Sequence, residues 1–122
     1  MKKIELFERA IAEQTGSLKD WGINPTLFAA YRSSMEAGNG EIDFSEVIWD
    51  YDIEEIARTL KENGISSFTI SSTFSSLIPT LAEFAKHGFQ MAGLTEVRAR
   101  YADWRTGERA LVPAIRMAAK EA

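Results

Sequence analysis

The sequence contains no cysteine, which excludes disulfide bonds, thiolate-bound metals and cysteine nucleophiles. It contains one histidine, His87, so a zinc site with several histidines cannot be built and a Ser–His triad is hard to build. No apolar run approaches the roughly 20 residues that a membrane-spanning helix needs. No apolar stretch typical of a secretory signal follows the first residues. These absences predict a cytoplasmic protein without a metal or another cofactor.

A basic excess is also lacking: the 122 residues carry a formal net charge of −4, whereas a general polyanion binder usually shows a clear basic excess. The charges are unevenly distributed along the chain. Residues 36–55 hold eight acidic residues and no lysine or arginine, whereas residues 89–122 hold six basic residues against four acidic ones. The length fits a single domain over residues 1–122, with a helical part over 1–38 and an α/β part over 41–122.

Apolar periodicity and capping residues predict two helices in the first third of the chain. The first covers residues 2–14. The second follows Asn24, which can cap it, has Pro25 in its first position and ends before Gly38. Its expected apolar stripe consists of Leu27, Tyr31 and Met35.

Two more helices are predicted further along. One begins at Asp52, which stands three residues before Glu55 as in a capping box, and ends before Gly64. Its buried stripe is expected to hold Ile53, Ile56, Ala57 and Leu60. The other covers residues 76–87, with Pro79 in the first turn, where its missing N–H does no harm.

Residues 42–44 and 67–71 read as strands. In the second of these, Phe68 and Ile70 alternate with residues that carry hydroxyl groups. Strict alternation is typical of a strand with one face on the core and one face in water. We therefore expect a solvated face that presents Ser67, Thr69 and Ser71.

The last third predicts a β-hairpin whose first strand covers residues 91–101. Asp103 and Arg109 are expected to flank its turn, in which Gly107 can adopt positive φ. The register that follows matches apolar residues and opposite charges across the strands. It pairs Tyr101 with Leu111, Val97 with Ile115, and Glu96 with Arg116.

Together these elements predict an α+β fold, a two-layer α/β sandwich with a small mixed sheet and N-terminal helices. Strand 67–71, helix 76–87 and strand 91–101 are expected to form one right-handed βαβ unit, and the C-terminal β-hairpin adds an antiparallel strand. Pro113 cannot donate a ladder hydrogen bond, so the final strand is expected at an edge of the sheet.

Two long segments carry a resemblance to a known group of proteins. They are EIDFSEVIWDYDIEEIARTLKENGISSFTISSTFSSLI and KHGFQMAGLTEVRARYADWRTGERALVPAIR. The sequence resembles a family of small uncharacterised proteins from plasmids and conjugative elements of Gram-positive gut bacteria, over most of the chain. The resemblance implies an accessory protein of a mobile element, and it implies no activity and no site residues.

The predicted hairpin carries the main candidate surface. Side-chain parity places Arg98, Arg100 and Arg116 on the same solvated sheet face as the hydroxyl groups of strand 67–71. Guanidinium groups there could bind carboxylates or phosphates, or they could simply keep the face soluble. Trp104 and Arg105 are expected at the tip, where the indole either folds over the hairpin or anchors a partner.

Two further candidates depend on weaker patterns. A hydroxyl-rich loop before the fourth helix could hold an anion on free backbone N–H groups, although it also suits helix capping. Its residues are Ser71, Ser72, Ser75 and Ser76. The acidic stretch includes Asp43, Asp50 and Asp52, and its spacing matches no cation site, so no metal site is expected.

The sequence therefore predicts a protein that is not an enzyme and that binds a macromolecular partner, a protein, through its hairpin and sheet face. Two alternatives stay open. One is nucleic-acid binding by the same arginines, which would weaken steeply with salt. The other is a metal-dependent hydrolase built on the acidic stretch. The oligomeric state is left open.

Overall fold

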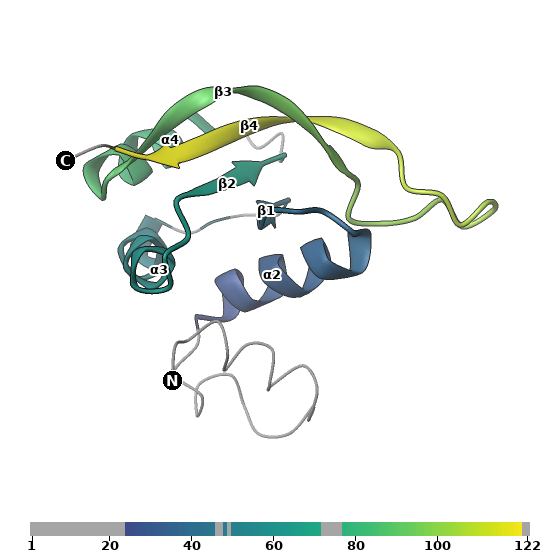
Figure 1. Ribbon diagram of the computed structural model, residues 1–122, viewed down its shortest axis with the longest axis horizontal. Helices are drawn as coiled ribbons and strands as arrows, with labels where there is room; N and C mark the ends of the chain where they lie inside the picture. The colour runs from purple at the N-terminus through teal and green to yellow at the C-terminus, as the bar shows by residue number, and fades with distance from the viewer. Residues whose placement is uncertain (1–23, 46–47, 49, 72–76, 121–122) are drawn as a thin grey trace, which may run out of the picture.

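The computed structural model describes residues 24–45, 48, 50–71 and 77–120 (Figure 1). The predicted helix over residues 2–14 lies outside them. The elements follow in the order α2 (Pro25–Ala37), β1 (Asp43–Phe44), α3 (Asp50–Glu62), β2 (Ser67–Ile70), α4 (Leu77–Lys86), β3 (Phe89–Arg98) and β4 (Leu111–Ala119). The α+β class with its small mixed sheet and closing hairpin is confirmed.

The four strands form one sheet in the order β1-β2-β4-β3. β1 runs parallel to β2, and β4 runs antiparallel to both β2 and β3. β2 and β3 therefore run in the same direction, as the predicted βαβ unit requires, but β4 lies between them. The adjacent parallel pair is β1 and β2, which α3 connects.

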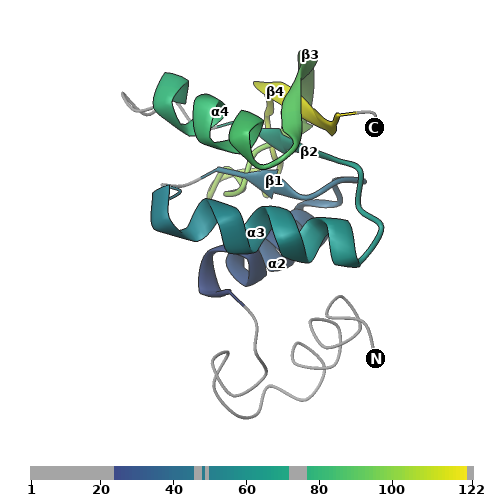
Figure 2. The same ribbon diagram turned by 90° about the vertical axis from the view of Figure 1, so that its left-hand side faces the viewer.

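Helices α3 and α4 pack together over one face of the sheet, which we call the helix face (Figure 2). At its centre, the ring of Phe68 on β2 lies 5.4 Å from that of Phe44, 4.9 Å from that of Phe84 and 5.1 Å from that of Phe89, measured between centroids. The stripe predicted for α3 is buried against these rings. One aromatic cluster thus joins β1, β2, β3 and α4.

Helix α2 has the predicted ends. The side-chain oxygen of Asn24 accepts hydrogen bonds from the backbone N–H groups of Thr26 and Leu27, and Gly38 closes the helix with φ of 78°. The predicted stripe is wrong at Met35, which is exposed, while Ser34 is buried. The buried position belongs to Ser34, a polar residue, so the pattern of apolar residues could not predict it.

Helix α3 begins at Asp50, so the prediction that Asp52 caps it is wrong. The carboxylate of Asp52 instead accepts hydrogen bonds from Asn24 Nδ2 at 3.0 Å and from Thr26 Oγ1 at 3.4 Å. Asp52 therefore connects the first turn of α3 to the first turn of α2 and does not cap its own helix.

The predicted solvated face of β2 is also wrong. Thr69 is buried, and its Oγ1 donates to Asp43 Oδ1 on β1 at 2.6 Å. The backbone N–H of Asp43 donates to Ser34 Oγ on α2 at 2.8 Å, so α2 packs on β1. Thr69 is therefore part of a buried polar cluster, whereas Ser67 on the same face is half-buried and donates to Glu41 Oε2 at 2.7 Å.

The predicted hairpin register is wrong by three residues: Val97 pairs with Val112, and Ile115 pairs with Leu94. At the turn, Asp103 N donates to Glu108 O, whereas the prediction placed Arg109 opposite Asp103. This accounts for one residue of the shift. Between this bond and the bond from Ala99 N to Ala110 O, three residues (100–102) on one side lie opposite the single residue Arg109 on the other. The two extra residues account for the rest of the register shift.

Strand β4 lies inside the sheet, so the predicted edge position of Pro113 is wrong. Ala99 and Ala110 form a hydrogen-bonded pair, because Ala99 N donates to Ala110 O. Hydrogen-bonded and non-hydrogen-bonded pairs alternate along an antiparallel ladder. Pro113 therefore falls in a non-hydrogen-bonded pair, with Glu96, and its nitrogen points away from β3. On the other side, β2 ends at Ile70, opposite Ile115. The proline therefore lies where no described residue of β2 needs its N–H.

Candidate functional site

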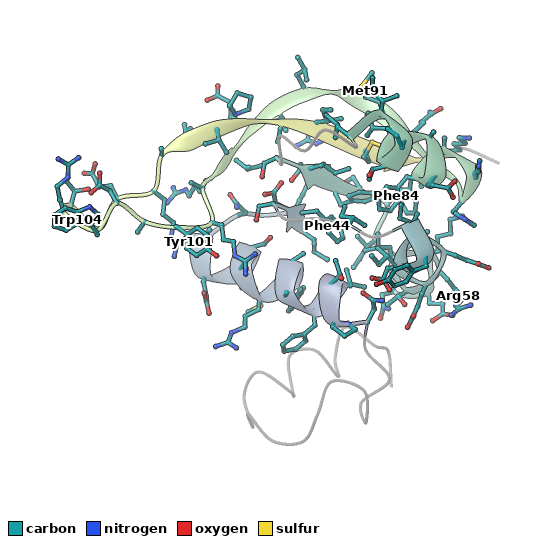
Figure 3. All side chains as sticks on the ribbon, turned by 180° about the vertical axis from the view of Figure 1, so that it is seen from behind. Phe44, Arg58, Phe84, Met91, Tyr101 and Trp104 are labelled. Atoms are coloured by element: carbon teal, nitrogen blue, oxygen red, sulfur yellow. The ribbon has the colours of Figure 1, made fainter. Side chains whose placement is uncertain are left out.

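Residues 99–110 connect β3 to β4 and project from the body of the protein; we call them the arm (Figure 3). Tyr101 lies on the arm and Trp104 lies at its tip, with 72% and 89% of their surfaces exposed. Large aromatic side chains normally contribute to a core or an interface. The arm therefore presents two aromatic side chains that the fold itself does not bury.

The tip is held by hydrogen bonds within the arm. Asp103 N donates to Glu108 O at 2.7 Å, and Gly107 N, with φ of 74°, donates to Asp103 O at 2.8 Å. The carboxylate of Asp103 accepts from Arg105 N at 2.8 Å. This backbone hydrogen bond, followed by the one to the Arg105 side chain, lowers the pKa of Asp103. The ionised carboxylate thus stabilises the turn that carries Trp104.

The base of the arm is fixed to the body from two sides. The guanidinium group of Arg109 donates through Nη1 to the carbonyl oxygens of Ala99, at 3.1 Å, and Arg100. Asn39, just after α2, donates from Nδ2 to Arg98 O at 3.1 Å and accepts from Arg98 N at 2.9 Å. These contacts hold the otherwise irregular backbone at the base of the arm.

Asn39→Ala is expected to loosen the base of the arm because it removes both hydrogen bonds to the backbone of Arg98. Both bonds are exposed, so the expected loss in the free energy of unfolding is only about 1 kcal/mol. Hydrogen exchange measured by mass spectrometry should become faster over residues 97–111. Asn39→Asp keeps the acceptor and should have a smaller effect, and unchanged exchange in Asn39→Ala would contradict this role.

Four of the predicted site residues meet on the arm or at its base: Arg98, Arg100, Trp104 and Arg105. The guanidinium carbon of Arg105 lies 5.8 Å from the centroid of the Trp104 ring, and that of Arg100 lies 5.4 Å from the centroid of the Tyr101 ring. Cations at these distances are attracted by the ring faces. The arm therefore pairs each exposed aromatic side chain with a positive charge.

Arg116 shares a sheet face with the hydroxyl residues of β2, as predicted, but not with Arg98, so the predicted common face is wrong in that part. It pairs with Thr69 and Gly93, whereas Arg98, five residues beyond Gly93 on the same strand, points to the other face. Its guanidinium group forms an ion pair with Glu41, Nη2 to Oε1, at 2.6 Å, and not with Glu96. The register shift separates residues that the sequence pattern had placed together.

The other candidates receive little support. Ser71 Oγ donates to Asp43 Oδ2 at 2.6 Å, and the remaining serines of the predicted anion site, Ser72, Ser75 and Ser76, lie outside the described residues. Where side chains are described, no group of three His, Asp or Glu residues is placed to hold a metal ion. Asp43 and Asp52 instead accept hydrogen bonds from hydroxyl and amide groups.

Sequence reasoning missed two arginines as candidate site residues, one on α2 and one on the arm. Arg32 on α2 and Arg109 both line a hollow of about 510 Å³ between the helix and the arm, together with Arg100 and Tyr101. Arg32 is exposed on a helix 68 positions before Arg100 in the sequence. Only the packing of α2 against the arm brings Arg32 to these residues, so no local pattern could have found it, whereas the predicted hairpin had already placed Arg109 beside the turn.

Comparison with known proteins gives a family and no activity. No curated protein matches the chain. No solved structure matches it either. None of the described helices has the length and apolar character needed to cross a bilayer. Residues 26–119 match the family model of a domain of unknown function, DUF7698, which covers most of the chain. The chain therefore belongs to the DUF7698 family.

Proposed function

We propose that this protein binds another protein through its arm, with Trp104 as the anchor and Arg98, Arg100 and Arg105 as polar contacts. The observation that carries the proposal is the exposure of Trp104 at the end of a projecting, internally bonded turn. Exposed tryptophan and arginine are the residue types that most often dominate interface energies. The role is one of recognition, and no catalytic step is assigned to the arm.

The order of the arm favours this role. Association costs conformational entropy when side chains and loops become fixed on binding. The backbone bonds around Asp103 and the contacts of Arg109 and Asn39 fix the arm before a partner arrives. Partner binding would then chiefly immobilise the tip side chains, so that burial of the indole contributes most of its free energy to affinity.

The cellular context that we propose is that of an accessory protein of a mobile genetic element, acting in the cytoplasm. It rests on the resemblance of the two long segments, residues 41–78 and 86–116, to proteins of plasmids and conjugative elements. In such a setting, a small protein of this kind would act by modifying the assembly or activity of its partner. An exposed indole beside arginines would suit a partner protein with an apolar pocket bordered by acidic groups.

The experiment compares Trp104→Ala with the wild-type protein and with Tyr51→Ala, which removes another exposed aromatic side chain, on α3. Each protein is immobilised and exposed to nuclease-treated lysate of the host at two salt concentrations. A partner held by the wild type and by Tyr51→Ala is then purified and its affinity measured by calorimetry. Trp104→Ala should weaken binding at least about tenfold.

The fold of each variant is checked by circular dichroism and thermal unfolding, because loss of binding has meaning only for a folded protein. Equal affinity of the folded Trp104→Ala variant and the wild type would refute the proposal. So would a partner lost equally from both aromatic variants, since that result would remove any special role of the arm.

A further inference from the structure

A second surface lies beneath the arm. The hollow of about 510 Å³ between α2 and the arm is followed by another of about 620 Å³, and both are lined by Glu36 and Arg109. Arg32, Arg100 and Tyr101 also line the first hollow, and Arg98 also lines the second. Because the two hollows share residues, they lie next to each other along α2. Together we call them the arm groove.

The arm groove is positively charged within an acidic protein. Four arginines line it, against two carboxylates, those of Glu36 and Glu108, whereas the whole chain has a formal charge of −4. Glu36 Oε1 lies 3.2 Å from Arg32 Nε, so these two form an ion pair, and the remaining lining charges are three arginines against Glu108. Charges separated by more than about 10 Å are largely screened at moderate salt. The groove can therefore attract an anion despite the acidity of the protein as a whole.

An aromatic ring stands among these charges. Tyr101 lines the groove, is mostly exposed and has the guanidinium group of Arg100 beside its ring. Arginines in a groove with an exposed ring for stacking are the combination that single-stranded nucleic acids require, because the arginines contact phosphates and the ring takes a base. An acidic peptide would use the arginines alone and would not require the ring.

We propose that the arm groove binds single-stranded nucleic acid. Arg32 and Arg98 contact the phosphates, and Tyr101 stacks on a base with the ring face that Arg100 does not cover. Such binding is largely independent of base sequence, because every base offers a flat face. This proposal shares Arg98 and Arg100 with the protein interface proposed above, but it uses the groove and not Trp104. The Trp104→Ala and Tyr101→Ala variants therefore distinguish the failure of one proposal from the failure of the other.

The test measures fluorescence anisotropy of fluorescein-labelled dT20 and rU20 with the full chain at 50 and 200 mM salt. We expect dissociation constants of roughly 1 to 100 μM at the lower salt and weaker binding at the higher. The two oligonucleotides distinguish DNA from RNA as the natural source of the strand. Tyr101→Ala should weaken binding by about tenfold, because it removes the stacking ring.

The decisive variant is the double substitution Arg32→Ala with Arg98→Ala. The hydrogen bonds between Arg98 and Asn39 use main-chain atoms of Arg98, so they are retained. Removing two phosphate contacts should lower affinity at least tenfold and reduce the slope of log K against log salt by about 1.4. Arg58→Ala is the matched control: Arg58 is an exposed helical arginine paired with the glutamate four residues later, as Arg32 is.

Three results would overturn the inference. The first is no binding of either oligonucleotide at 50 mM salt. The second is an equal loss of affinity in Arg58→Ala and in the double variant, which would show that any surface charge has the same effect. The third is displacement of the oligonucleotide by a ten-residue glutamate peptide at lower concentration than by unlabelled dT20, which would assign the groove to an acidic protein segment.

Discussion

Phe68→Ala is expected to lower the free energy of unfolding by about 4 kcal/mol, near the upper end of the range for truncating a buried aromatic side chain. The ring lies fully buried on a strand inside the sheet and contacts three other phenylalanine rings from β1, α4 and β3. Its loss leaves a cavity at a point where rigid elements meet from several directions. They cannot all move inwards to fill it, so little of the loss is recovered.

The effect is measured by urea unfolding followed by circular dichroism. Domains of this size are stable by about 5 to 15 kcal/mol, so the variant should be marginally folded. Phe68→Leu keeps most of the volume and should lose less than half as much. Leu94→Ala truncates a residue that is 83% exposed and should change stability by under about 0.5 kcal/mol. A loss below about 1.5 kcal/mol in Phe68→Ala would contradict the central place of this ring.

Asp43→Ala is the second substitution with a large expected effect, a loss of about 3 kcal/mol. The carboxylate is only 5% exposed and accepts hydrogen bonds from Thr69 Oγ1 and Ser71 Oγ, both at 2.6 Å. Alanine leaves the buried hydroxyl of Thr69 without its acceptor and removes a charge-assisted bond to each of the two residues. Unsatisfied buried donors cost more than the bonds themselves contribute.

Asp43→Asn separates the loss of hydrogen bonds from the loss of charge. The amide oxygen can accept from one hydroxyl group, and the amide nitrogen can donate to the oxygen of the other. We expect this variant to lose less than about 1.5 kcal/mol and to unfold with the same cooperativity as the wild type. Equal destabilisation by asparagine and alanine would show that the negative charge, and not the hydrogen bonding, stabilises this cluster.

The local elements of this fold were predictable where a short-range signal specifies them. Asn24 and Gly38 bound α2 because capping and positive φ are properties of single residues. The stripe of α3 follows from its period alone and is buried as predicted. The hydroxyl residues of β2 do share one face of the strand, as their alternation predicts. The burial of Thr69 was not predicted, because α2 is positioned over β1 by long-range packing.

The arrangement of the strands was not predictable in the same way. The sequence around Val97 and Ile115 permits several registers that match apolar residues, and the choice depends on the irregular backbone at residues 100–102. Pro113 suggested an edge strand, but a proline is tolerated inside a sheet where the neighbouring strand has already ended. Because of this register, Arg116 does not join the predicted site, whereas Arg32 lies beside the arm and Arg109 lies on it. The position of Trp104 at the tip was predicted correctly, because it does not depend on the register of the strands.

The position of β4 has a consequence for how the chain acquires its structure. This strand forms the middle of the sheet, bonded to β2 on one side and to β3 on the other, yet it follows both of them in the sequence. Until residues 111–119 have left the ribosome, β2 and β3 have no common neighbour. The nascent chain must keep its unpaired strand edges from meeting other chains until then, and the sheet assembles in a late, cooperative step.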